Sequence, residues 1–329
     1  MNISNSITAP ILLIVILVML ILFKGAFLKN AEVVVEPPNN IAANQNQDGS
    51  GDDVISYNGV KYYPDRIVLL MIIAYVCSFL LPMVFYVKLK GMDWFGGLKL
   101  TLPNMRMIPF SIYMFLILVI GTVFIDYLFF SLSGETLAFP TINTGGNIVF
   151  NIGVFLAFIF VPAACEEFVF RAVLIAEYEK YGLLLSLLAT SIAFAMSKLS
   201  LQLFCVYFYA SIIFFICVKL TNSILIPVIL HTGYNFFNIY MENEIMGVLK
   251  SEQNRFVLLF VLSILFMIFI SLSLSAAEYY YYRKVYANDP LPVNIPKSQG
   301  IIANFAKIFL SPSFIITVII FFIYISVTV

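Results

Sequence analysis

Two adjacent carboxylates, Glu166 and Glu167, precede Arg171 in a stretch that is otherwise apolar enough to cross a membrane. Each charge at the centre of a bilayer costs about 2.5–3.5 kcal/mol on insertion scales, so a cluster of three needs a reason. One interpretation is an internal ion pair that joins helices. The other is chemistry inside the membrane, and we start from it because ionisable groups within spans usually mark functional sites.

The spacing of these three charged residues indicates which of them can form an ion pair on the helix. Glu167 and Arg171 are four residues apart, so they lie on one face of a helix and can pair directly. Glu166 points about 100° away from Glu167. We therefore expect Glu167 and Arg171 to support the structure. Glu166, a buried carboxylate without a partner, is left as the candidate general base.

The single histidine of the chain, His231, stands four residues before Asn235 in a later apolar segment, with Asn238 a turn further on. On a helix, His231 and Asn235 share a face. Counted from Ser223, they lie about 12 and about 18 Å into the membrane, which is compatible with the depth of Glu166. The alternative is that they only hydrogen-bond neighbouring helices.

A lysine is the candidate neighbour of the first glutamate. Gly182 is a natural helix stop between two apolar runs, which predicts a helical hairpin with its tip there. Glu166 lies sixteen residues before Gly182 and Lys198 sixteen after it, so both sit roughly 24 Å from the turn. Lys198 therefore either approaches Glu166 or lies at the far surface, where its ammonium reaches the headgroups.

Composition places these residues in a membrane protein. Of the 329 residues, 62% are hydrophobic and 11% charged, whereas soluble domains carry about 25% charged residues. The 18 basic and 18 acidic residues balance, so we expect no nucleic-acid partner. With one histidine and four cysteines in apolar segments, we expect no disulfide framework, no metal site and no cofactor.

We predict an all-α, polytopic membrane helix bundle with about nine transmembrane spans. The spans are expected at 9–28, 67–87, 107–132, 148–176, 183–200, 203–220, 223–241, 256–277 and 308–328. The chain then divides into an N-terminal membrane anchor, a polar flexible loop, two accessory spans, a core bundle and two C-terminal spans, at 1–28, 29–66, 67–144, 145–241 and 242–329.

Orientation follows from the basic residues. Lysine and arginine gather in the segments 88–106 and 278–307. The positive-inside rule therefore predicts an inside N-terminus and an outside loop 29–66.

The pattern Glu166-Glu167-x-x-x-Arg171, followed by His231-x-x-x-Asn235, resembles the CPBP family. This family includes type II CAAX prenyl proteases and bacteriocin-processing or bacteriocin-immunity membrane proteins. The resemblance implies that Glu166 activates a water that attacks a peptide bond. It also implies that His231 and Asn235 stabilise the oxyanion, while Glu167 and Arg171 support the site.

The resemblance covers about residues 145–241, and its second motif departs from the family. The family pattern FxxxH aligns with the stretch from Phe194 to Lys198, so lysine stands where the family has histidine. An ammonium about 4 Å from Glu166 would attract it by roughly 4 kcal/mol at an effective dielectric of 20, which weakens the carboxylate as a base. Alternatively, burial favours a neutral amine that takes part in proton transfer.

The resulting expectation is an intramembrane, glutamate-type endopeptidase of a prokaryotic cell membrane that cleaves a membrane-associated, prenylated or leader peptide. The alternative is a catalytically inactive family member that serves as a scaffold, regulator or immunity protein. A third alternative, a transporter with a carboxylate proton relay, would favour paired broken segments in two matching halves, which we do not find.

Overall fold

The computed structural model describes residues 5–23, 55–57, 60–62, 64–92, 101–137, 139–140, 142–143, 148–251, 255–286 and 300–328. Most of the predicted polar loop 29–66 lies outside these residues. The described elements are, in chain order, α1 (Asn5–Phe23), β1 (Ile55–Tyr57), β2 (Val60–Tyr62), α3 (Pro64–Tyr75), η2 (Val76–Leu80), α4 (Leu81–Lys90), η3 (Met105–Met107), α5 (Ile108–Ser133), β3 (Ile142–Asn143), α6 (Ile148–Val154), η4 (Phe155–Phe160), α7 (Val161–Glu167), η5 (Phe168–Leu174), α8 (Ile175–Tyr178), η6 (Glu179–Tyr181), α9 (Leu183–Ser197), α10 (Phe204–Thr221), α11 (Leu225–Tyr240), α12 (Glu242–Lys250), α13 (Arg255–Tyr286), α14 (Ile301–Phe309) and α15 (Pro312–Thr328).

Five of the described helical segments are long and apolar enough to cross a membrane. A sixth arises if α14 and α15, bent by 53° at their junction, form one span. Two further apolar helices, Ala9–Phe23 and Leu183–Ser197, are shorter. The predicted all-α polytopic bundle is confirmed, but the count of nine spans is not. Hydropathy detected the apolar runs and could not tell a full crossing from a shorter helix.

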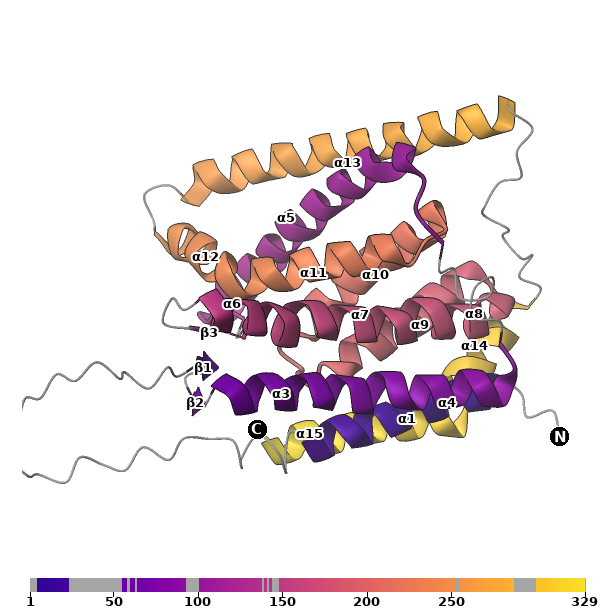
Figure 1. The fold of residues 1–329 in the computed structure, drawn as a ribbon. Helices are drawn as coiled ribbons and strands as arrows, with labels where there is room; N and C mark the ends of the chain where they lie inside the picture. Colours follow the sequence, from indigo (N-terminus) through magenta and orange to yellow (C-terminus); the bar gives the residue numbers. More distant parts are fainter. Residues whose placement is uncertain are drawn as a thin grey trace, which may run out of the picture.

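The segment from Ile148 to Tyr181 runs through the middle of the bundle (Figure 1). Its central residues are buried on all sides, as expected of a helix that is apolar all round. Two π-helical segments, η4 and η5, flank α7, which carries both glutamates. Pro162 lies in the first turn of α7, where its missing N–H coincides with the change from π to α geometry.

The predicted hairpin is present, with Gly182 at its tip. Gly182 adopts φ 113° and ψ 152°, a region that side chains with a Cβ rarely occupy. The second arm, α9, has 15 residues and so rises only about 22 Å, less than the roughly 30 Å of a hydrocarbon core. The chain therefore turns at residues 198–203 inside the bundle and returns as α10.

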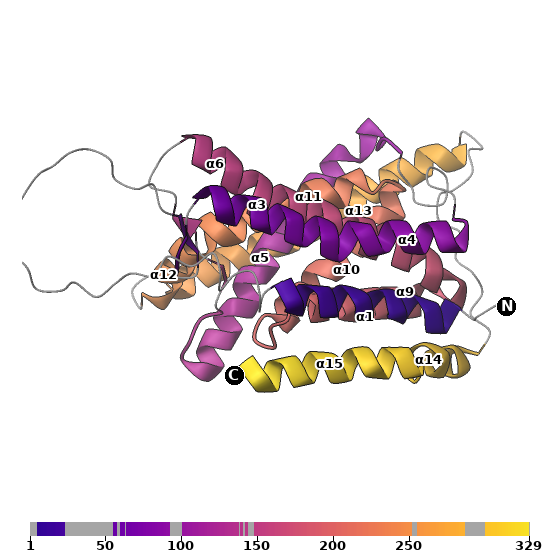
Figure 2. The same ribbon diagram turned by 60° about the horizontal axis from the view of Figure 1, so that its bottom comes forward.

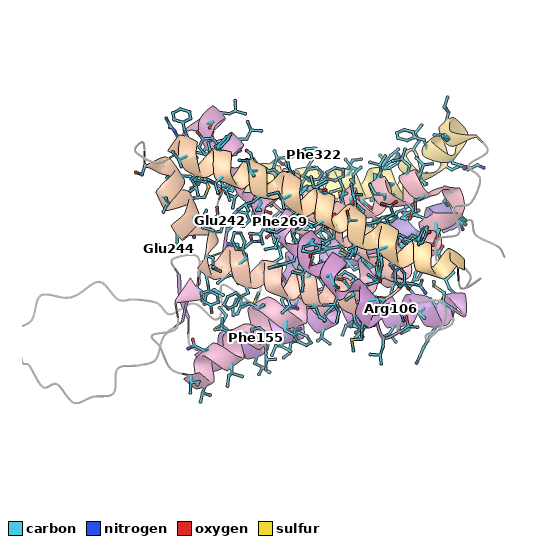
Figure 3. All side chains as sticks on the ribbon, turned by 90° about the horizontal axis from the view of Figure 1, so that it is seen from above. Arg106, Phe155, Glu242, Glu244, Phe269 and Phe322 are labelled. Carbon is cyan, nitrogen blue, oxygen red and sulfur yellow. The ribbon has the colours of Figure 1, made fainter. Side chains whose placement is uncertain are left out.

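The N-terminal helix covers the hairpin on one side. In Figure 2, α1 lies between α15 and the α3–α4 layer, and it contacts both as well as α8 and α9. On the opposite side, α13 packs against α5 through the ring pairs Tyr113–Phe269 and Phe124–Phe266. Phe269 is labelled on this helix in Figure 3. The remaining face of α13 exposes large apolar side chains, which suits contact with lipid.

The two ends of the bundle differ. The ends of α4 and α13 and the start of α5 lie at the same end of the bundle (Figure 1), so the described parts of the two basic segments share that end. The orientation in the membrane stays a prediction. At the other end, β1 pairs with β2 and with β3 to form a small antiparallel sheet beside α12. Glu242 and Glu244 of α12 also lie at this end (Figure 3).

A buried acid pair joins α5 to α12. Asp126 accepts a hydrogen bond from the Leu137 backbone N–H through Oδ1 at 2.7 Å, while its Oδ2 and both Glu242 oxygens lack a partner among the described groups. A proton shared between the two carboxyl groups accounts for these oxygens. Burial raises the pKa of Glu242 to about 9, with the hydrogen bond and charge of Asp126 adding to the effect.

This raised pKa makes stability pH-dependent. Because the folded pKa of about 9 exceeds the ordinary 4.5, the folded state binds more protons than the unfolded state between these values. Its stability therefore falls as pH rises, by at most about 1.4 kcal/mol per pH unit. Glu242→Gln, whose amide can donate to Asp126, should remove this decline and raise the Tm more at about pH 8.5 than at about pH 5.5. The exposed Glu244→Gln is the control, and equal shifts for both variants would contradict the shared proton.

Close packing of α5 against α10 depends on Gly121. A Cβ at this position would overlap the ring and hydroxyl of Tyr209, whose hydroxyl donates to the Ile117 carbonyl at 2.7 Å. We expect Gly121→Ala to cost about 1–3 kcal/mol of unfolding free energy, measured by thermal unfolding in detergent. Gly247→Ala, which faces open space on α12, should not lower the Tm. A Gly121→Ala protein as stable as the wild type would disprove this packing.

Candidate active site

A cavity of about 280 Å³ lies between α1 and α3 on one side and α7, the α9–α10 turn and α11 on the other. Apolar side chains line its outer wall, among them Leu20, Leu70, Met71, Tyr75, Phe79 and Phe158. Polar side chains line the inner wall: Glu166, Ser197, Lys198, Ser200, Asn235 and Asn238. A cavity with one apolar and one polar wall suits a substrate that carries both kinds of surface.

The α9–α10 turn brings irregular backbone to the cavity. Leu199 adopts φ 53°, a left-handed conformation that is uncommon and strained for a branched side chain. Nearby, the Ser200 hydroxyl accepts a hydrogen bond from the Leu203 backbone N–H at 3.3 Å. Non-helical backbone at membrane depth persists only where protein or water satisfies it. The turn therefore favours a hydrated cavity.

Lys198 lies beside Glu166. The distance from Lys198 Nζ to Glu166 Oε2 is 2.5 Å, and the lysine side chain is 13% exposed. The ammonium also lies 4.9 Å from the ring centres of Phe194 and Tyr207. Of the two alternatives left by the sequence, the structure selects the interior position. It also corrects the expectation that Glu166 lacks a partner, because the hairpin supplies one from its second arm.

The second carboxylate forms the predicted ion pair. Glu167 Oε2 lies 3.0 Å from Arg171 Nε, and both side chains are fully buried. Arg171 Nη2 donates to the Ser211 hydroxyl at 3.2 Å. The guanidinium stacks over the rings of Phe194 and Phe214 at 4.5 and 5.3 Å, so cation–π attraction supplements the ion pair.

His231 connects the two glutamates. Its Nδ1 lies 2.8 Å from Glu167 Oε1, and its Nε2 lies 3.7 Å from Glu166 Oε2. A Glu167 carboxylate paired with Arg171 accepts a hydrogen bond when Nδ1 carries the proton, and Nε2 then faces Glu166. The ring is fully buried behind the cavity wall and stacks on Phe214 at 4.9 Å.

Asn235 lies on the cavity wall, and one hydrogen bond uses part of its amide. Its Nδ2 donates to the Ile159 carbonyl of η4 at 3.1 Å, which ties α11 to the central helix. The amide has a second N–H, which this bond does not use. Asn235 can therefore hold its position and still donate to a bound group.

The structure thus brings every predicted site residue into one cluster of two layers. Glu166, Lys198 and Asn235 line the cavity. The supporting residues Glu167, Arg171 and Phe194 are buried behind it together with His231. Whether His231 donates to an oxyanion stays a prediction, since its ring does not reach the cavity.

Sequence analysis did not identify Tyr207, whose ring lies over the Lys198 ammonium and lines the cavity. It stands nine residues after Lys198, on the other side of the break between the predicted spans 183–200 and 203–220, so no helical spacing relates the two residues. In the part of the chain that the structure describes, no three His, Cys, Asp or Glu side chains are grouped to hold a metal ion.

Residues 148–237 match the family model described as type II CAAX prenyl endopeptidase Rce1-like. This segment is similar to the type II CAAX prenyl endopeptidases. The resemblance predicted from the motifs is confirmed over this range, which contains both glutamates, Arg171, Lys198, His231 and Asn235. Comparisons with curated proteins and with solved structures give no match.

The endopeptidase-like segment coincides with the centre of the bundle. It begins at α6 and ends in α11, so it includes the hairpin, the α9–α10 turn and the polar wall as far as Asn235. The apolar wall comes mostly from α1, α3 and η2, which lie outside it, and Phe158 of η4 adds one side chain from within it. The chain is a multi-pass membrane protein whose polar cluster lies within the matched segment. The replacement of a family histidine by Lys198 stays a prediction.

The buried Glu167–Arg171 ion pair can be tested by its effect on the free energy of unfolding. Arg171→Met would leave Glu167 charged and buried without its cation, at a cost of about 3–5 kcal/mol. The double variant Glu167→Gln with Arg171→Met removes both charges and should recover much of this loss in thermal unfolding. A single variant as stable as the wild type would show that Arg171 does not neutralise Glu167.

Proposed function

We propose that the protein is an intramembrane endopeptidase that hydrolyses a peptide bond with Glu166 as the general base. The observation that carries this proposal is the position of Glu166, Lys198 and Asn235 on one cavity wall. The segment that holds them is similar to type II CAAX prenyl endopeptidases.

In the proposed reaction, the Glu166 carboxylate takes a proton from a water in the cavity, and the oxygen of that water attacks the carbonyl carbon of the peptide bond. The resulting oxyanion accepts hydrogen bonds from the free N–H of Asn235 and from the Lys198 ammonium. Collapse of the tetrahedral intermediate breaks the C–N bond. Glu166 then returns its proton to the leaving amine.

Lys198 has two effects in this scheme. Its charge stabilises the ionised form of Glu166, which weakens the carboxylate as a base. The same charge lies where negative charge develops, and only one of its three N–H donors is needed by Glu166. The scheme requires the second effect to prevail, because an interaction made only in the transition state accelerates the reaction.

The surroundings of the cavity support a membrane-associated substrate. The apolar wall formed by α1 and α3 faces the polar wall across the cavity. A peptide with a lipid or apolar anchor could place its anchor on the first wall and its scissile bond on the second. The substrate class we propose is therefore a prenylated or otherwise membrane-anchored peptide, or a leader peptide.

A second candidate function is a non-catalytic one, in which the cavity binds a membrane peptide without cleaving it. The observation that favours it is the Glu166–Lys198 ion pair, in which the ammonium stabilises the ionised carboxylate and so weakens it as a base. Here Lys198→His would create or raise hydrolysis by removing the permanent charge. Under the endopeptidase proposal, by contrast, the wild-type protein with Lys198 already hydrolyses the peptide.

Glu166→Gln tests the endopeptidase directly. The substitution keeps the shape and removes the base, so hydrolysis should fall at least a hundredfold, in line with general-base contributions of about 10²–10⁴. The measurement is fluorescence release in proteoliposomes from a quenched peptide ending in S-farnesylcysteine, two aliphatic residues and methionine. The same peptide with an N-terminal palmitoyl anchor in place of the farnesyl group is assayed in parallel.

The matched control is Glu177→Gln. Glu177 is a buried carboxylate on the same long helix, within 4.0 Å of lysines 90 and 180 and remote from the cavity lining. This control should keep turnover within about twofold of the wild type, because it removes a comparable charge without touching the proposed base. Equal turnover by Glu166→Gln and wild type would refute the role of Glu166. Binding of both peptides without cleavage by the wild type would favour the non-catalytic function.

A further inference from the structure

Asn238 presents an unused amide to the cavity. Its side chain is 3% exposed, yet it lines the same cavity as Glu166 and Lys198. Neither Oδ1 nor Nδ2 has a hydrogen-bond partner among the described groups. A buried amide with both ends unpaired is costly, so this position calls for a ligand that satisfies it.

The neighbouring polar groups are engaged elsewhere. The Tyr234 hydroxyl accepts a hydrogen bond from Thr122 Oγ1 at 3.1 Å. Its looser side-chain contact with the Asn238 amide falls outside hydrogen-bond geometry and engages at most one of the two amide N–H groups. Asn235, one turn earlier, donates to the Ile159 carbonyl at 3.1 Å. Asn238 therefore differs from Asn235, because its Oδ1 and at least one of its N–H groups are available to a molecule in the cavity.

A peptide backbone is the ligand that matches the oxygen and the nitrogen of the Asn238 amide. A carboxamide can accept from a backbone N–H through its oxygen and donate to a backbone C=O through its nitrogen. A peptide that enters an apolar bundle must satisfy these backbone groups, since each unpaired group in a water-poor site is expensive. On the opposite wall, formed by the described residues of α1, α3 and η2, Tyr75 is the single lining residue whose side chain can hydrogen-bond.

The spacing places this contact near the proposed scissile bond. Asn238 lies three residues after Asn235 on α11, a rise of about 4.5 Å. An extended peptide advances about 3.3 Å per residue. A substrate whose scissile carbonyl lies at Asn235 would thus bring the backbone of an adjacent residue to Asn238.

We infer that Asn238 is a substrate-binding residue that holds a backbone amide next to the scissile bond through paired hydrogen bonds. This inference rests on the proposed function, and it adds a residue that lies one position beyond the segment matched by the family. The residue selects for a peptide backbone and not for a particular side chain.

The experiment compares an amide substrate with its ester analogues. Two versions of the farnesylated peptide replace the backbone N–H by oxygen on one or the other side of the scissile bond, which itself stays an amide. In the wild type, one ester should lower kcat/KM about tenfold, mainly through KM, since it removes one hydrogen bond. In Asn238→Leu, the all-amide peptide should lose a similar factor, and the ester should cause no further loss.

Asn304→Leu is the matched control. The Asn304 amide donates to the Tyr181 carbonyl at 3.3 Å, away from the cavity. This variant should keep the wild-type ester penalty, and Asn238→Leu should keep kcat within about threefold. If Asn238→Leu shows the same KM and the same ester penalty as the wild type, the inference is wrong.

The outcome remains decisive if Asn238→Leu fails to fold. Wild-type protein that cleaves both esters as well as the amide excludes a backbone contact at these positions, without any variant. If the wild type binds the peptides without cleaving them, the proposed reaction fails, and the ratio of Kd values for amide and ester peptides gives the same comparison. Equal Kd values would then overturn the role of Asn238.

Discussion

The contact between Glu166 and Lys198 fixes two arms of a helical hairpin at one depth inside an apolar bundle. Neither charge could stay there alone, because an unpaired ion in a low-dielectric interior costs several kcal/mol. The contact forms because the second arm of the hairpin, α9, is short. Because α9 ends after 15 residues, its last residues turn within the bundle and bring a lysine to the first glutamate.

Charge balance extends behind this pair. The negative charges of Glu166 and Glu167 are matched by Arg171 and Lys198, and the neutral His231 lies between the carboxylates. Rings surround the two cations, with Phe194 in contact with both. The buried residues therefore position the residues that line the cavity. His231 of α11 contacts Glu167, and Arg171 donates to Ser211 of α10, so both contacts fix the helix that carries Glu166.

The number of residues between charged side chains indicated those contacts of the candidate site that depend on helical geometry. The Glu167–Arg171 pair follows from a spacing of four. Equal distances to Gly182 made the meeting of Glu166 with Lys198 one of two alternatives, and the structure decides between them. The count of nine spans was not confirmed, because an apolar run reveals burial and not the length of a crossing. The break between the predicted spans 183–200 and 203–220 placed a turn at this point. It did not predict the left-handed conformation of Leu199, which no Gly or Pro signals and which tertiary constraint must hold. Asn238 was noticed only as part of a polar stripe, and its unpaired state became visible once its neighbours were placed.

The central claim is that Glu166 and Lys198 form one unit that serves both stability and hydrolysis. A double-mutant cycle with Glu166→Gln, Lys198→Met and the combined variant tests it most directly, with thermal unfolding and peptide hydrolysis measured on each protein. We predict a coupling of at least about 1 kcal/mol in stability, with the combined variant more stable than the sum of the single changes allows, yet inactive. Additive stability effects, or hydrolysis retained by the combined variant, would contradict the account.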